Sequence, residues 1–158
     1  TDECLRTFDP NYKLNPPLRS QEHVDACING LKDGTLDVIA SCHAPRSSEK
    51  KMLEIDLAPF GASTIEATLG LVVTQLINPG HLDWSTAIAK MTVNPARVLG
   101  VNKGTLEVGA DADVTIIDPL AEWTVGVNSH SKSQNTPFAG WQLTGRAKGV
   151  IVGGQVKR

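Results

Sequence analysis

A short polar segment near residue 42 holds three side chains that could do chemistry. It follows the apolar run 36–40 and contains Cys42, His43 and Arg46. Such a run, coming after a turn, is typical of a buried parallel strand. The carboxyl ends of parallel strands form the functional edge of α/β folds, so we expect residues 41–46 to lie at a site. A thiolate can ligate zinc, and a guanidinium can pair with a carboxylate.

The histidines do not form a metal-binding pattern. The chain has four, and no two of them have the i, i+2 or i, i+4 spacing of a zinc site: His23, His43, His81 and His130. Cys42 and His43 are adjacent, so in an extended segment they point to opposite faces and cannot easily reach one ion. The sequence by itself therefore predicts no metal centre and a structural role for His43. Two readings of Cys42 stay open, a metal ligand and a buried, inert thiol.

Hydrophobic periodicity predicts the elements that position this segment. Residues 1–20 carry three prolines and no periodicity, which indicates an ordered loop. A helix follows because Val24, Cys27, Ile28 and Leu31 repeat on one face. The predicted helices run from Ser20 to Lys32, from Ser63 or Thr64 to about Ile77, from Ser85 to about Met91, and from an Asn94–Pro95 start to Gly100.

After Gly100 the pattern changes to short strands and turns. Gly153–Gly154 predicts a hairpin turn, and Gly109–Asp113 is most simply a turn that leads into a strand. The predicted strands are Val114–Ile117, Trp123–Val125, Lys148–Val152 and Gln155–Lys157. This part indicates a small β unit that shares its core with the preceding residues, because neither part alone offers much core.

Composition excludes several classes of protein. The 158 residues fall short of the roughly 250 of a complete (β/α)₈ barrel. A net charge of −2 excludes a surface field that would hold nucleic acid or an anionic membrane. The most apolar stretch, residues 69–77, is too short to cross a bilayer. Three cysteines without a CxxC pair indicate a reducing, cytoplasmic setting. The charged residues 49–56, Lys51 among them, are interpreted as a solvated stretch.

Several segments together resemble one enzyme family in order and spacing. They are Lys13–Arg19, Asp37–Pro45, Ala58–Gly61, Asn94–Arg97, Gly104–Leu106, Gly109–Asp113, Asn135–Phe138 and Gly145–Arg146. Over essentially the whole chain they closely resemble the dihydroorotases of the cyclic amidohydrolase superfamily. Hydantoinases and allantoinases share the Gly-Ala-Asp-Ala-Asp and Asn-Pro-Ala segments. Asn15 before the double proline and the Ala-Pro pair after His43 therefore point to dihydroorotase in particular.

The resemblance implies a fold and a reaction. The fold would be α/β, with residues 1–100 forming the C-terminal part of a (β/α)₈ TIM barrel and residues 101–158 forming strands of its small terminal β unit. The family interconverts dihydroorotate and N-carbamoyl-aspartate in pyrimidine biosynthesis. In that family a binuclear zinc site generates a hydroxide, which attacks the amide carbonyl of the ring.

The resemblance also assigns roles to individual residues. Asn15, Arg46, Phe60 and Gly61 fall at positions that contact the substrate, the last two through backbone groups. The bland alternatives are that Asn15 only caps a turn and that Phe60 only fills the core. Cys42 stands where the family has an aspartate that accepts and returns a proton beside zinc, and it is the one candidate metal ligand. Arg46 stands where the family has a substrate-contacting histidine, and it cannot act as an acid or base near pH 7.

Two functional hypotheses follow. The family's other zinc ligands precede the point where this chain begins, and the chain begins at Thr1 without a methionine, so we expect a processed start or a fragment that holds no zinc and is inactive alone. One hypothesis is an enzyme, favoured by the intact Asn15 and Phe60–Gly61. The other is a pseudo-dihydroorotase that supports a partner such as aspartate transcarbamoylase, favoured by Cys42 and Arg46. A barrel cut open in this way is also expected to self-associate.

Overall fold

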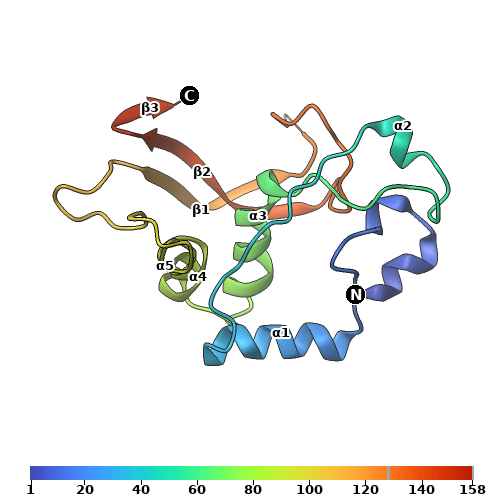
Figure 1. Cartoon of the computed structure of the whole chain (residues 1–158), viewed down its shortest axis with the longest axis horizontal. Helices are drawn as coiled ribbons and strands as arrows, with labels where there is room; N and C mark the ends of the chain where they lie inside the picture. The colour runs from blue at the N-terminus through green and yellow to red at the C-terminus, as the bar shows by residue number, and fades with distance from the viewer. Residues whose placement is uncertain (128, 158) are drawn as a thin grey trace. The chain divides into compact units, whose positions relative to one another are not determined.

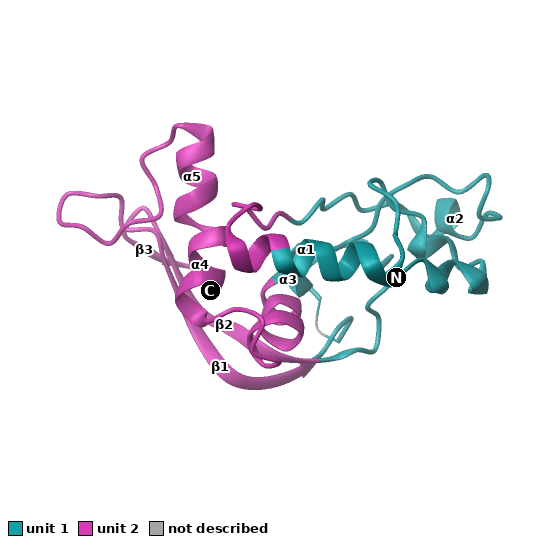
Figure 2. Cartoon of the chain, turned by 90° about the horizontal axis from the view of Figure 1, so that it is seen from below, with its two compact units in different colours: residues 1–29, 41–68, 124–142 teal, residues 30–40, 69–123, 143–158 magenta. Residues whose placement is uncertain are grey.

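A computed structural model describes residues 1–127 and 129–157 and contains short helices and one small sheet (Figure 1). These residues group into two compact units (Figure 2). Unit 1 consists of residues 1–29, 41–68 and 124–142, and unit 2 consists of residues 30–40, 69–123 and 143–158. Each unit is therefore assembled from three separate stretches of chain. The division expected from the sequence lies at residue 100, between a barrel part and a terminal β unit. That division is a different one from these two compact units, and it stays a prediction.

The four predicted helices are present with shifted ends. They are α1 (Gln21–Asp33), α3 (Ile65–Val72), which continues as a π-helical turn (Val73–Ile77), α4 (Trp84–Met91) and α5 (Val93–Leu99). The short helix α2 (Ser48–Lys51) lies in the charged stretch, where no helix was predicted. Helix α5 starts at Val93, one residue before the predicted Asn94, and Gly100 ends it with a φ of 67°. Residues 1–20 were expected to form only a loop, but they contain the 3₁₀ helices Asp2–Thr7 and Pro10–Tyr12. Among the described helices, none has the length and apolar character that a membrane crossing requires.

The predicted strand over residues 36–40 is wrong, because this stretch has no regular secondary structure and is not part of the described sheet. Neighbouring helices bond to its backbone groups instead, and α4 supplies two of these bonds. The Ile39 N–H donates to the Lys90 carbonyl at 3.0 Å, and the buried Lys90 ammonium donates to the Leu36 carbonyl at 2.5 Å. The apolar character that suggested a strand is used for packing, because Ile39 lies against the cluster of Val72, Leu82 and Ala87.

The sheet has the strand order β1 (Val114–Thr124), β2 (Gln142–Val152), β3 (Gln155–Lys157). Strands β2 and β3 are antiparallel and form the predicted hairpin, with positive φ at both Gly153 and Gly154, as a type I′ turn requires. Two separate strands were predicted where β1 is continuous. The strand pattern in the sequence is interrupted at Pro119, which lies within β1. Proline lacks a backbone N–H, and an edge strand tolerates this because one of its sides need not form sheet hydrogen bonds.

Helix α3 and its π-helical turn pack closely on the sheet of unit 2. A Cβ atom on Gly70 would lie 2.9 Å from the Trp123 ring and 3.0 Å from Leu143. A Cβ atom on Gly145 would lie 2.7 Å from Val73. The Trp123 indole N–H donates to the Gly145 carbonyl at 3.0 Å. The two glycines thus allow the helix and the sheet to approach each other, and Leu143 and Val73 are fully buried between them.

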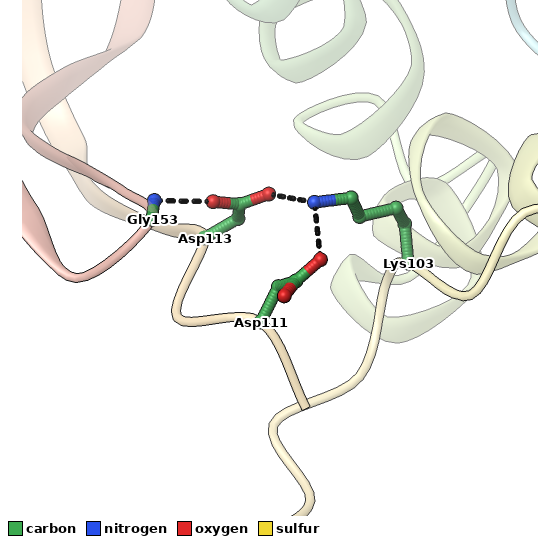
Figure 3. A network of polar contacts seen from close by, with 4 residues as sticks. All are labelled: Lys103, Asp111, Asp113 and Gly153. Atoms are coloured by element: carbon green, nitrogen blue, oxygen red, sulfur yellow. Dashed lines mark hydrogen bonds and ion pairs between the residues drawn. The ribbon is translucent and has the colours of Figure 1, made fainter. Parts of the chain in front are cut away.

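An ion-pair network ties the hairpin to the segment before β1 (Figure 3). The Lys103 ammonium lies 2.7 Å from a carboxylate oxygen of Asp111 and 2.7 Å from one of Asp113. The second Asp113 oxygen accepts the Gly153 N–H at 2.7 Å. Hydrogen bonds to Asp111 and Asp113 raise the pKa of Lys103, and the bonds from Lys103 and Gly153 lower the pKa of Asp113. In this network the aspartates of the Gly109–Asp113 segment bind their own chain.

The Gly153 amide shift is expected to report this network during an acid titration. The pKa of Asp113 is lowered in the folded state, so its stabilising contacts are complete above its ordinary pKa of about 3.9 and are lost as the pH falls through the lower folded value. In an NMR titration the Gly153 amide should therefore move with a midpoint below about 3.9, and Lys103→Met should move that midpoint up. The same midpoint in both proteins would contradict the network.

Candidate active-site segment

Four segments of unit 1 come together and carry the residues that the sequence singled out. We call them the loop cluster; they are residues 13–15, 42–46, 58–63 and 133–136. The Gly61 N–H donates to the Lys13 carbonyl at 3.1 Å, and the Ala44 N–H donates to the Ala62 carbonyl at 2.9 Å. The fourth segment joins through Asn135, whose contacts are described below. The loop cluster therefore brings the backbone segments of Asn15, Cys42, Arg46, Phe60 and Gly61 into one part of unit 1.

Arg46 is held at both its backbone and its side chain. Its N–H donates to Asn135 Oδ1 at 2.8 Å, and its Nε donates to the Phe60 carbonyl at 2.8 Å. The residue is exposed, and Nε is the one guanidinium nitrogen that bonds to the described chain. The guanidinium is thus oriented beside Phe60 with its two remaining nitrogens able to pair with a carboxylate.

Phe60 presents its ring at the surface of the loop cluster instead of filling the core. The residue is 50 % exposed, and the Lys13 ammonium lies 4.9 Å from the ring centroid, as in a cation–π contact. The same ammonium donates to the Asp56 carbonyl at 2.9 Å. An apolar ring and a positive charge therefore lie side by side.

Gly61 has a backbone that other residues would not adopt without strain. Its φ is 116°, and a Cβ atom there would lie 2.5 Å from the Ala44 carbonyl oxygen. The parallel bridge between His43 and Ala62 holds the two segments at this separation. Glycine is needed here for both its conformation and its lack of a side chain.

Asn15 and Cys42 are exposed side chains of the loop cluster. The exposure of Cys42 argues against the reading of this residue as a buried thiol. Asn15 precedes Pro16 through a cis peptide bond. No contact of either side chain is among those described, so their roles stay predictions.

His43 is used by the chain itself. Its Nδ1 accepts the N–H groups of Thr64 and Ile65 at 3.1 and 3.3 Å, which places the imidazole at the N-terminus of α3. This nitrogen therefore carries no proton in the contact. The sequence pointed to Ser63 or Thr64 as the cap, but the orphan N–H groups of the first turn are satisfied by a histidine 21 residues upstream.

Lys51 was interpreted as part of a solvated stretch, and that interpretation is wrong. Lys51 is 7 % exposed, whereas the adjacent Lys50 is exposed. Its ammonium donates to the carbonyls of Pro10 and Pro59 at 2.7 and 3.0 Å. Burial lowers the pKa of Lys51, and repulsion from Arg46 acts in the same direction. The sequence carries no signal that separates Lys51 from Lys50, because both lie in the same charged run.

The described residues do not fit a zinc site. Across residues 1–127 and 129–157, no three His, Cys, Asp or Glu side chains lie close enough together to hold a metal ion. Cys42 alone would supply one ligand, whereas zinc takes three or four from a protein.

The class of protein is shown by a match that covers most of the chain. A sequence model of the Amidohydrolase family matches residues 13–157, and the chain belongs to this family.

Relatives within the family narrow the similarity. The chain is 54% identical over 157 residues to a dihydroorotase of Pelotomaculum thermopropionicum, and 48% identical over 157 residues to one of Acetivibrio thermocellus. Each alignment covers 99% of this chain and 37% of the relative. Among solved structures, an L-hydantoinase of Arthrobacter aurescens superposes with a TM-score of 0.88 at 30% identity, covering 99% of this chain and 36% of that one. A D-hydantoinase of a Thermus species gives 0.85 at 29% identity, covering 93% and 33%.

The chain thus spans little more than a third of the length of the relatives that it matches. Its mixed helical and sheet structure is a part of the fold of these amidohydrolases.

Proposed function

We propose that this chain contributes to a dihydroorotase, which reversibly interconverts dihydroorotate and N-carbamoyl-aspartate in pyrimidine biosynthesis. The observation that carries the proposal is the 54% identity to a dihydroorotase over 157 residues. The charge of the loop cluster supports it. Lys13, Arg46 and Lys51 put three cationic groups around the Phe60 loop, and both proposed substrates carry carboxylates.

We assign substrate binding to Asn15, Arg46, Phe60 and Gly61. Arg46 would pair with a carboxylate, the Phe60–Gly61 backbone would bond the polar edge of the ring, and Asn15 would do the same from the neighbouring segment. Cys42 is assigned to the proton-transfer position, where a thiol replaces the family's carboxylate. This substitution is expected to slow turnover more than it weakens binding.

The proposal places the chain in a larger fold. Residues 1–100 are proposed to be the C-terminal part of a (β/α)₈ TIM barrel, and residues 101–158 the strands of its small terminal β unit. The zinc that the resemblance implies would need ligands besides Cys42, because no described cluster can hold it. We propose a cytoplasmic setting from the cysteine pattern.

A chimeric enzyme tests the proposed function. Residues 1–158 would replace the aligned segment of the Pelotomaculum dihydroorotase, and dihydroorotate hydrolysis would be measured beside that intact enzyme. We expect turnover that is low but above background. A folded chimera that neither binds nor hydrolyses dihydroorotate, even with Cys42→Asp and Arg46→His combined, would contradict the proposal.

A catalytically silent scaffold is the second candidate. The resemblance implies that Cys42 and Arg46 stand where the family has an aspartate and a histidine, and these two departures favour it. Such a pseudo-dihydroorotase would support a partner, for which aspartate transcarbamoylase is the candidate. A chimera that becomes active only when both residues are changed would favour this scaffold over the enzyme.

Self-association of the isolated chain is the expected behaviour in solution. Large apolar side chains are exposed on the chain, including Leu120 and Val108, and β1 and β3 are the edges of the described sheet. Apolar surface and open strand edges both favour association. Sedimentation should therefore show species larger than a 158-residue monomer. A monomer with one sharp thermal transition would contradict this expectation.

A further inference from the structure

We propose that Asn135 is a positioning residue that fixes the Arg46 backbone and the Gly61 carbonyl in the geometry that receives a cyclic-amide substrate with a carboxylate. We call the two Asn135 side-chain hydrogen bonds, to the Arg46 N–H and to the Gly61 carbonyl, the clamp. The inference rests on the proposed function for its substrate, whereas the clamp rests on these contacts alone. Asn135 does not need to touch the substrate, because it would act through Arg46 and Gly61.

The Asn135 side chain joins two segments that are far from it in sequence. Its Oδ1 accepts the Arg46 N–H at 2.8 Å, and its Nδ2 donates to the Gly61 carbonyl at 3.1 Å. Asn135 is 6 % exposed, so water does not compete freely for these groups. A buried amide that bonds with both of its ends specifies one arrangement of the segments around it.

The chemistry of the two partners fixes which way the amide faces. Arg46 offers an N–H donor, and Gly61 offers a carbonyl acceptor. Exchanging Oδ1 and Nδ2 would place two donors together and two acceptors together, so the amide has one favourable orientation. The Ser133 hydroxyl lies within hydrogen-bonding distance of both the Arg46 carbonyl and Asn135 Oδ1. Its single proton serves one of them at a time.

The segment that carries Asn135 is itself anchored on both sides of the clamp. The Ser63 N–H donates to the backbone carbonyl of Asn135 at 2.7 Å. Upstream, the Glu66 carboxylate of α3 accepts the N–H groups of Ser131 and His130 at 2.7 and 3.2 Å. The backbone around Asn135 is therefore held by hydrogen bonds of its own, in addition to those of the Asn135 side chain.

The clamp controls the residues to which we assign substrate binding. Arg46 continues from the clamped N–H to a guanidinium bonded to the Phe60 carbonyl, and Gly61 follows Phe60 directly. Gly61 has no freedom to compensate, because Ala44 fills the space beside its Cα. Losing either Asn135 bond should thus misplace a substrate contact without removing it.

Amide hydrogen exchange in the 158-residue chain tests the clamp without any ligand. Asn135→Ala should speed exchange at the Arg46 N–H by about tenfold or more, because that amide loses its acceptor. The Ser63 amide should change little, because it bonds to the backbone carbonyl of residue 135, which the variant keeps. Gln134→Ala, at an exposed neighbour, is the matched control. Unchanged exchange at Arg46 in a folded Asn135→Ala variant would overturn the clamp.

Dihydroorotate binding to the chimeric enzyme described above, measured by titration, tests what the Asn135 contacts do for the substrate. Asn135→Ala should weaken binding by about tenfold, and Gln134→Ala should not. Asn135→Asp keeps an acceptor for Arg46 but sets a carboxyl oxygen against the Gly61 carbonyl, so Arg46 should stay protected while affinity falls. This variant decides the outcome if Asn135→Ala does not fold. Unaltered affinity in a folded variant would overturn the positioning role. No binding by the parent chimera would count against the proposed substrate alone, since the exchange result stands independently.

Discussion

Changing Cys42 to aspartate in the chimeric enzyme is expected to raise dihydroorotate hydrolysis by about 10²- to 10⁴-fold, the usual contribution of general acid–base catalysis. The resemblance implies an aspartate at this position, and its carboxylate can accept and return a proton. The thiol is larger and softer than a carboxylate.

Arg46→His alone should raise activity less, because it would restore a substrate contact while the proton acceptor stays absent. The two changes together should be more than additive, since a well-bound ring turns over only when the proton can move. Cys27→Asp is the matched control, because Cys27 is also an exposed cysteine but lies on α1 and is not one of the loop-cluster residues. If the unmodified chimera is already as active as the intact relative and Cys42→Asp changes nothing, Cys42 is not at the proton-transfer position.

Changing Gly61 to alanine is expected to destabilise the chain by about 3 kcal/mol or more. An alanine in the left-handed region costs about 1–2 kcal/mol by itself. Here the new Cβ atom would also lie 2.5 Å from the Ala44 carbonyl oxygen, and a backbone atom cannot move aside as a flexible side chain would. Urea unfolding of the parent and the variant measures the difference.

Gly140→Ala separates the two causes. Gly140 has a φ of 78°, but nothing lies within 4 Å of the position where its Cβ atom would be. We therefore expect this variant to lose only the conformational part, about 1–2 kcal/mol. Equal losses from the two variants would mean that the Ala44 segment moves away from Gly61, and that the loop cluster is looser than its hydrogen bonds indicate.

Local patterns predicted the elements whose cause is local. The apolar repeat of α1 placed that helix within one residue at each end, and the two glycines of the β2–β3 hairpin placed its turn. The resemblance also singled out Arg46, Phe60 and Gly61, which contacts between distant segments bring together. In each case the signal lies in the residues themselves or in their order.

Features that depend on residues far apart in the sequence could not be predicted from local patterns. The 36–40 stretch has the composition of a strand, but helices α1, α4 and α5 supply its hydrogen-bond partners. Lys51 is buried by the carbonyls of Pro10 and Pro59, and nothing nearby in sequence marks it. Asn135 was visible only as part of a family motif, because its partners lie 74 and 89 residues away. Tertiary hydrogen bonds of this kind leave no periodic trace.

The interleaving of the two units constrains how the chain can fold during synthesis. Unit 1 begins with residues 1–29 and is completed by residues 124–142. At the usual rate of translation, roughly a hundred residues take about 5 to 20 s to emerge. The first stretch of unit 1 must wait that long for its last partners. No contiguous fragment shorter than residues 1–142 contains the whole unit, so a truncation before Gln142 would leave the Asn135 clamp or its neighbours incomplete.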